Sequence, residues 1–251
     1  MAEHTELVHL EVADGVATIS LDSEHNRNAL SRQLVGELTA HLTTAGDDPQ
    51  VRAVLLRSAG RVFCSGADLS EATSDGMVDG AKAIVALQRQ IATLPKPVVV
   101  VLAGPVRAGG LGIVGAADIV LAAESVTFAL TEVRLGLAAA VISLSLLERF
   151  SDRAAADLFL SGRTFDAAEA VTAGLVTRAV PDDGLADEVT RTLADLTLGY
   201  PQGLRETKAL LNHDLVARID ALGDQVAEQS ARLFGSDEAR EAMTAFLQRK
   251  R

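Results

Sequence analysis

Hydrophobic and polar residues alternate along the start of the chain. The segment LVHLEVADGVATISLD (7–22) keeps this alternation on both sides of the pair Asp14-Gly15. A period of two is typical of strands, and an Asp-Gly pair between two such segments indicates a tight turn. We therefore predict that the chain opens with a hairpin of two antiparallel strands.

Helical and strand patterns then follow one another. Ser31, a favoured helix N-cap, precedes leucines at 34, 38 and 42 that share one helical face. Unbroken hydrophobic runs such as PVVVVLAG (97–104) are expected in strands buried on both faces. The pattern therefore predicts an α/β fold with a mostly parallel sheet covered by helices. The predicted elements after the first helix are a strand at 51–58, a helix at 77–97, a strand at 97–104, a helix at 109–118, and strands at 118–123 and 126–131.

Beyond Leu137 the pattern is mainly helical. Helices are predicted at 139–150, 152–162 and 164–174, the last with a capping box of Asp166 and Glu169, followed by a short strand at 174–180. Residues 185–251 are predicted to be helical, with breaks at Pro201 and Gly235. We place a boundary near Tyr200, between an α/β core (1–199) and a helical region (200–251). A hydrophobic stripe in this region is expected to pack on another subunit or on its own core: Leu210, Leu211, Leu215, Ile219, Leu222 and Val226.

Charge and composition exclude several classes of protein. The chain has 34 acidic and 23 basic residues, a net charge of −11, which disfavours nucleic-acid binding. No hydrophobic segment approaches the roughly 20 residues that span a bilayer, so we expect no membrane partner. The single cysteine, Cys64, excludes an intramolecular disulfide, and the acidic N-terminal segment does not resemble a secretory signal. We expect a cytoplasmic protein.

Two glycine-containing loops each follow a predicted buried strand. CSGADL (64–69) follows one strand and RAGGLG (107–112) follows the next. Loops after adjacent parallel strands can direct backbone amides at one point, and paired amides stabilise an enolate or tetrahedral oxygen. Glycine and alanine suit such positions because a ligand must approach the main chain closely. These loops therefore predict an oxyanion-binding site.

A dinucleotide site is the alternative for the second loop. Gly110, Gly112 and Gly115 match G-x-G-x-x-G, and Glu132 lies 20 residues past Gly112, where a ribose-binding acid is expected. The segment GPVRA separates this motif from the end of the preceding strand, whereas a pyrophosphate-binding turn begins at the strand end. We therefore disfavour this interpretation.

Five segments in order resemble the crotonase superfamily, also called the enoyl-CoA hydratase/isomerase family. They are HNRNALS (25–31), VFCSGADL (62–69), AGPVRAGGLGIVGAADIVLA (103–122), TFALTEVRLGL (127–137) and SARLFGSDEAREAMTAFLQRKR (230–251). The resemblance runs nearly from end to end. It implies a spiral of ββα units closed by a C-terminal helical trimerisation region, commonly paired into hexamers.

The resemblance also assigns catalytic roles. It places the oxyanion-binding amides on Ala67 and Gly109, with Ala108 in place of a family glycine, and it makes Glu132 the catalytic carboxylate. Without the resemblance, the position of Glu132 would favour a helix-start carboxylate with no catalytic role. Gly112 stands where hydratases of the family carry a second glutamate. One carboxylate could hydrate a 2-enoyl-CoA or shift a double bond as an isomerase. Because EVRLGLAAAVIS (132–143) together with Gly112 resembles a hydratase branch of the family, we favour hydration. A non-catalytic acyl-CoA-binding relative, or a related enolate reaction such as decarboxylation or thioester cleavage, are further alternatives.

The remaining predictions concern coenzyme A, which is part of the substrate; no separate cofactor is expected. No His or Cys spacing suggests a metal site. Cys64 and Ser65 lack a neighbouring base and are expected to be packing residues, and Asp68 is expected to cap the loop that holds Ala67. Residues predicted to contact the CoA thioester are His25, Arg27, Ser65, Gly66, Ala67, Asp68, Leu69, Gly109, Gly110, Phe246 and Arg249.

Overall fold

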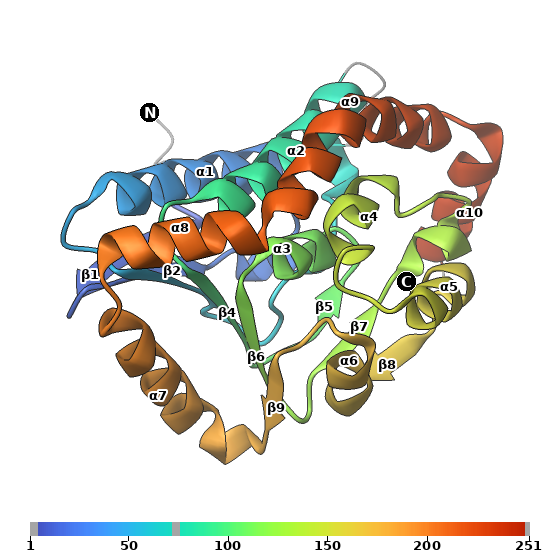
Figure 1. Cartoon of the computed structure of the whole chain (residues 1–251). Coiled ribbons are helices and arrows are strands. Elements are labelled where there is room, and N and C mark those ends of the chain that lie inside the picture. The colour runs from blue at the N-terminus through green and yellow to red at the C-terminus, as the bar shows by residue number, and fades with distance from the viewer. Residues whose placement is uncertain (1–4, 72–75, 249–251) are drawn as a thin grey trace.

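The computed structural model describes residues 5–71 and 76–248, and its centre is a six-stranded sheet (Figure 1). The strands lie in the order β1-β2-β3-β4-β6-β9. Their bounds are β1 (Val8–Ala13), β2 (Val16–Leu21), β3 (Ala53–Ser58), β4 (Val98–Leu102), β6 (Ile119–Ala123) and β9 (Arg178–Val180).

The strand pairing follows the predicted pattern. β1 and β2 form the antiparallel hairpin, with Asp14 and Gly15 at φ +51° and +78° in the turn. Every other neighbouring pair in this sheet is parallel, and Val54 lies opposite Val98 in the centre. The side chains of β4 are nearly all buried, as expected for a strand covered on both faces. The prediction of a mostly parallel α/β sheet is confirmed.

Helices cover both sides of this sheet. α1 and α2 lie along one side and α7 along the other (Figure 1). Ser31 caps α1 as predicted, since its hydroxyl accepts a hydrogen bond from Leu34 N at 3.2 Å. The helices are α1 (Arg32–Asp47), α2 (Met77–Thr93), α3 (Gly110–Ala116), α4 (Ala140–Leu146), α5 (Asp152–Ser161), α6 (Ala167–Ala173), α7 (Leu185–Thr197), α8 (Pro201–Leu211), α9 (His213–Phe234) and α10 (Asp237–Gln248).

A second, three-stranded sheet was only partly predicted. It contains β5 (Val106–Arg107), β7 (Thr127–Ala129) and β8 (Thr164–Asp166), in the order β5-β7-β8. β7 was predicted as a strand, β5 was not predicted, and β8 was expected to be the start of a helix. Helix α6 begins after β8, where Asp166 accepts from Glu169 N at 2.8 Å. The Glu169 carboxylate pairs with Arg163, so only half of the predicted capping box forms.

The hydrophobic stripe of the C-terminal region is divided between two environments. Leu215, Ile219 and Val226 of α9 are buried against α2 and α4, with Leu222 packed beside them. Leu210 and Leu211, at the end of α8, are 80% and 73% exposed. Most of the stripe therefore packs on the chain's own core, and two leucines remain on the surface of the protomer.

A buried polar cluster attaches α8 to the core. The Lys208 ammonium is 2.7 Å from the Asp118 carboxylate and donates to the carbonyls of Ile91 and Lys96. Asn212 donates to the other Asp118 oxygen at 2.8 Å. Because each of these contacts satisfies a buried polar atom, the cluster fixes α8 over the start of β4 and β6 without leaving a charge unpaired.

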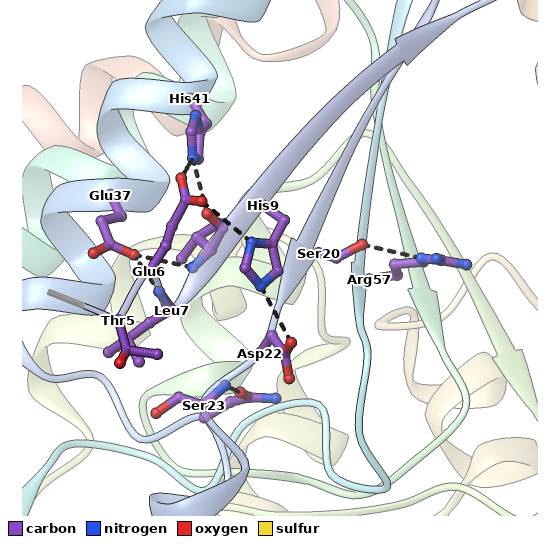
Figure 2. A network of polar contacts seen from close by, with 12 residues as sticks. Thr5, Glu6, Leu7, His9, Ser20, Asp22, Ser23, Glu37, His41 and Arg57 are labelled. Atoms are coloured by element: carbon purple, nitrogen blue, oxygen red, sulfur yellow. Dashed lines mark hydrogen bonds and ion pairs between the residues drawn. The ribbon is translucent and has the colours of Figure 1, made fainter. Parts of the chain in front are cut away.

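Side chains also attach the N-terminal segment to α1, as Figure 2 shows. Glu37 of α1 accepts hydrogen bonds from Leu7 N and Val8 N at 2.6 and 3.0 Å. Glu6 lies between His9 and His41, with contacts of 3.4 and 3.3 Å. These contacts hold β1, an edge strand, against the helix that covers it. No helix within residues 5–71 and 76–248 has both the length and the hydrophobicity to span a bilayer.

Candidate active site

Three neighbouring parallel segments end at the same edge, and the predicted site residues follow their carboxyl ends. Cys64 forms a parallel bridge with Val106 of β5, and Val106 pairs in parallel with Phe128 of β7. Ala67 and Gly109 lie three residues past Cys64 and Val106, and Glu132 lies four residues past Phe128. Ligand sites in α/β folds lie beyond the carboxyl ends of parallel strands, and these three residues occupy that edge.

The conformation of the first loop leaves the Ala67 N–H without a hydrogen-bond acceptor among the described residues. Gly66 adopts φ +103°, a conformation that glycine favours, and a Cβ on it would lie 2.9 Å from Ala108 Cβ. Leu30 N donates to Gly66 O at 2.8 Å, and Asp68 N donates to Leu30 O at 3.4 Å. The Ala67 N–H, between these two bonds, has no acceptor among the described residues, and Ala67 is exposed.

The second loop brings the Gly109 amide next to the first. A Cβ added to Gly109 would lie 3.5 Å from Ala67 N, so the two loops are in direct contact. Ala108, at φ +46°, is a non-glycine residue in the left-handed region, and its N–H donates to Ala129 O at 3.0 Å. Gly109 is the N-cap of α3, and its N–H has no acceptor within the described part of the chain. The two loops therefore offer two adjacent, unpaired amides.

Glu132 is a partly buried residue whose carboxyl group has no side-chain hydrogen-bond partner among the described residues. It lies in the 3-10 helix η3 (Thr131–Leu135), directly after β7. Its Oε2 atom is buried, and none of the described residues forms a hydrogen bond with it. Burial raises the pKa of Glu132 to about 7, although its own backbone amide acts in the opposite direction. A carboxyl group with a pKa near neutrality can both accept and return a proton. The alternative of a helix-capping carboxylate does not account for this buried, unpaired oxygen.

The position of the missing second glutamate is filled by other side chains. A Cβ on Gly112 would lie 2.7 Å from Ile142 Cγ2 and 3.3 Å from Gln88 Cδ. Behind it, the Ser145 hydroxyl contacts Gln88 Oε1 at 2.7 Å and Gly112 O at 3.2 Å. The absence of a side chain at position 112 therefore allows α3 to pack closely against α2 and α4.

The glycines of the alternative dinucleotide motif have the same packing role. A Cβ on Gly110 would lie 2.6 Å from Cys64 Cβ, and one on Gly115 would lie 2.8 Å from Ser145 Oγ. All three motif glycines are buried inside α3. A pyrophosphate-binding glycine must present its backbone to the ligand. The dinucleotide interpretation is therefore not supported by the structure.

Side chains around Ala67 stabilise the first loop. Asp68 accepts hydrogen bonds from Ser70 N at 2.9 Å and from Asn26 Nδ2 at 3.0 Å. Burial would raise the pKa of Asp68, but the hydrogen bonds from Ser70 and Asn26 lower it below its ordinary value. The Ser65 hydroxyl donates to Asn26 O at 3.0 Å. Burial raises the pKa of the Cys64 thiol to about 12, which excludes a reactive thiolate.

The residues predicted to bind CoA have different surroundings. His25 and Arg27 are exposed on the segment beside the first loop, where Arg27 O accepts a hydrogen bond from Ser65 N at 3.1 Å. Leu69 lies at the start of the 3-10 helix η2 (Leu69–Glu71) and is partly buried. The Phe246 side chain and Arg249 lie outside the described residues. CoA contact by all of these residues stays a prediction.

Sequence reasoning missed the residues that support the two loops. Asn26 connects the N-terminal segment to Asp68 and Ser65, but its only local signal was a position between His25 and Arg27. Gln88 was detectable as a polar residue on the buried face of α2, where it is fully buried. Within the described ranges, no cluster of three or more His, Cys, Asp or Glu side chains could hold a metal ion.

Comparison with known proteins shows which family and fold the chain resembles. The family model described as enoyl-CoA hydratase/isomerase matches residues 11–251. A solved enoyl-CoA hydratase from Mycobacterium avium is 45% identical, with a TM-score of 0.92 over 98% of this chain and 97% of the other. A second, from Mycobacterium avium subsp. paratuberculosis K-10, is 30% identical, with a TM-score of 0.87 over 97% and 96%. A methylmalonyl-CoA decarboxylase at 23% identity and a TM-score of 0.81, over 97% and 95%, shares the fold.

Proposed function

Because the chain belongs to the enoyl-CoA hydratase/isomerase family, we propose that it adds water across the double bond of a 2-enoyl-CoA thioester. The observation that carries this proposal is the buried, unpaired Oε2 of Glu132 at the same edge as two unpaired amides. Two amide donors suit a thioester oxygen that becomes negative, and a carboxyl group with a pKa near neutrality suits proton transfer.

In the proposed reaction the two amides stabilise the enolate oxygen, and Glu132 takes up one proton and then returns one. The Ala67 and Gly109 amides donate to the thioester oxygen, which carries the negative charge of the enolate. Glu132 accepts a proton from water as the hydroxide adds to the β-carbon. The protonated Glu132 then returns a proton to the α-carbon, which restores the carboxylate and completes the 3-hydroxyacyl thioester. Loss of one such amide donor costs about 3 kcal/mol of barrier lowering.

The test is turnover of crotonyl-CoA by the wild type and by Glu132→Gln. Turnover is followed as loss of the ultraviolet absorbance of the conjugated thioester. Glutamine preserves the shape of Glu132 but accepts no proton, so turnover should disappear while acyl-CoA binding by calorimetry persists. Glu124→Gln, at an exposed carboxylate, is the matched control and should keep full activity. Full activity in Glu132→Gln would refute the proposal. Binding without turnover of any enoyl thioester by the wild type would favour a non-catalytic relative.

An isomerase is the second candidate, and Gly112 is the observation that favours it. Ile142 and Gln88 fill the space beside Gly112, so Glu132 is the carboxylate proposed to transfer the proton. A double-bond shift needs one base that removes a proton at one carbon and returns it at another. Incubation with a 3-enoyl-CoA distinguishes the two reactions: an isomerase produces a rise in conjugated-thioester absorbance, whereas a hydratase without isomerase activity leaves this substrate unchanged.

Arg27 and His25 are proposed to contact the CoA phosphates. They lie exposed beside the first loop, on a segment that Ser65 and Asp68 connect to Ala67. Positive charge at this place offsets the net charge of −11, which would otherwise repel a polyanionic substrate. Arg27→Glu should raise KM for acyl-CoA severalfold with little change in kcat. Arg57→Glu, on the exposed side of β3, is a control with the same change in charge.

A homotrimer, or a hexamer of two trimers, is the proposed assembly. Its support in the chain is a set of exposed hydrophobic side chains around α8: Leu198, Tyr200, Leu210 and Leu211, at 81%, 84%, 80% and 73% exposure. Leu210 and Leu211 are neighbours at the end of α8, and adjacent exposed hydrophobic side chains are typical of an interface between subunits. Sedimentation velocity should detect a trimer or hexamer, and a monomer would contradict this part of the proposal.

A further inference from the structure

The turn that carries Glu132 is closed by hydrogen bonds to the backbone of that residue. Leu137 N donates to Glu132 O at 3.0 Å, and Gly136 N donates to the same carbonyl. Gly136 adopts φ +69° and ψ +18°, in the left-handed region where glycine carries no steric penalty. The conformation of Gly136 therefore determines how the turn closes around Glu132.

Helix α10, from the C-terminal end of the chain, rests on this turn. A Cβ on Gly136 would lie 3.3 Å from Ala239 N and 3.3 Å from Glu238 Cγ, both in α10. Ala239 is fully buried, although α10 is near the end of the chain. The Ser236 hydroxyl accepts from Ala239 N at 3.2 Å and donates to Leu233 O at 2.7 Å, which fixes the start of α10. A side chain at position 136 would therefore press against α10, which would have to move by a few tenths of an ångström.

The end of α5 also contacts this turn. A Cβ on Gly162, the C-cap of α5, would lie 2.9 Å from Val133 Cγ1 and 3.0 Å from Leu130 O. Arg134 Nε donates to Ser161 O at 3.4 Å. Figure 1 shows α5 and α10 at the same end of the molecule. The 3-10 helix with Glu132 thus contacts two helices, α5 and α10, and α10 belongs to the C-terminal region.

We propose that α10, seated on Gly136, is a positioning element that holds Glu132 in its reactive place. This inference rests on the proposed function of Glu132 in proton transfer. It makes Gly136 and Ala239 positioning residues, because neither donates nor accepts the transferred proton. The C-terminal region then affects proton transfer by Glu132 through the contact between α10 and Gly136 within one chain.

The first test replaces Gly136 by alanine. The added Cβ strains the left-handed backbone and pushes against α10, which should displace Glu132 and admit water. A small misplacement of a reacting group lowers turnover strongly, so kcat should fall at least about tenfold while KM stays within about twofold. The acid limb of the kcat profile should move to lower pH because a hydrated carboxyl group ionises more readily. The charged groups beside this turn are Arg134 and Glu238, and neither is altered.

Gly15→Ala is the matched control. Gly15 also adopts a left-handed conformation, at φ +78°, but it lies in the β1–β2 turn with its nearest contact at 3.5 Å from an added Cβ. It should lose stability for the same backbone reason and keep kcat and the pH profile of the wild type. Ala239→Gly removes a buried methyl group and weakens helix α10 beside the Gly136 contact without adding bulk. It is the second variant and should lower kcat in the same direction.

An NMR titration makes the inference independent of turnover. In protein with carboxyl-labelled glutamate, the Glu132 signal, assigned by its absence in Glu132→Gln, should titrate at lower pH in Gly136→Ala than in the wild type or Gly15→Ala. An unchanged titration together with unchanged kcat in folded Gly136→Ala and Ala239→Gly would overturn the positioning role. If the wild type turns over no enoyl thioester, the proposed function is refuted. If the Glu132 signal still titrates at lower pH in Gly136→Ala than in the wild type, the positioning of Glu132 by α10 is nevertheless supported.

Discussion

Replacing Glu132 by glutamine should abolish turnover and also stabilise the fold above neutral pH. Burial raises the pKa of Glu132 from 4.5 to about 7. Each pH unit between the folded and unfolded pKa corresponds to about 1.4 kcal/mol, so the ionised carboxylate destabilises the native state by about 3 kcal/mol. This cost is absent below pH 4.5, where the group is protonated in both states. It grows as the pH rises and is complete above about pH 7. Glutamine is neutral throughout and avoids it.

The assay is urea unfolding of both proteins, at one protein concentration, at about pH 4 and about pH 8.5. Circular dichroism is a suitable probe, because the chain has no tryptophan and one tyrosine. The stability of Glu132→Gln relative to the wild type should increase by about 3 kcal/mol between the two pH values. Other carboxylates titrate in both proteins and cancel in this difference. A difference that does not change with pH would refute the burial of an ionisable Glu132.

Three further substitutions test the packing around the site. Ala108→Gly should keep full activity and should not lower the melting temperature, since alanine at φ +46° carries about 1 kcal/mol of strain; a clear fall in the calorimetric melting temperature would contradict this. Gly112→Ala should lower the free energy of unfolding by about 1–3 kcal/mol, because its Cβ would meet Ile142 Cγ2 at 2.7 Å. This loss should be smaller when Ile142→Ala is also present. Strictly additive losses of the two substitutions in urea unfolding would argue against the contact. Lys208→Met should destabilise the folded protein by about 3 kcal/mol, because Asp118 then stays buried without its ion pair. Adding Asp118→Asn should recover part of this stability. No recovery in urea unfolding would count against the ion pair.

Local pattern predicted the larger elements of the fold. The hairpin at Asp14-Gly15, the Ser31-capped helix and the buried strand at 98–102 each carry a complete signal within a few residues. The α/β class, the crotonase-like fold and the family resemblance are confirmed. The division into a core (1–199) and an oligomerisation region (200–251) stays a prediction.

The short strands could not be predicted in the same way. β5 has two residues and β8 has three, and each exists because β7 lies beside it. Phe128 and Phe165 pair across β7 and β8 and stack with ring centres 5.3 Å apart, although they are far apart in the sequence. Such elements depend on tertiary pairing, which no local period reveals.

The site shows the same division between local and non-local information. The glycines beside Ala67 and Gly109 indicated bare amides at two strand ends. That the two amides meet depends on the bridge between Cys64 and Val106, whose register is set by tertiary contacts. The sequence shows glycine at position 112, where the resemblance would place a glutamate. Only the structure shows that Ile142 packs where a side chain on residue 112 would begin.

Isotope labelling follows the proton that Glu132 is proposed to transfer to the α-carbon. Crotonyl-CoA is incubated with the wild type, Glu132→Gln and Ala67→Pro in deuterium oxide, and the product is returned to ordinary water and analysed by mass spectrometry and proton NMR. The wild type should give a 3-hydroxyacyl-CoA with one deuterium at the α-carbon, and either variant should give essentially no product. Deuterated product formed by Glu132→Gln at the wild-type rate would contradict proton transfer by Glu132, and normal turnover by Ala67→Pro would contradict the role of the amide pair.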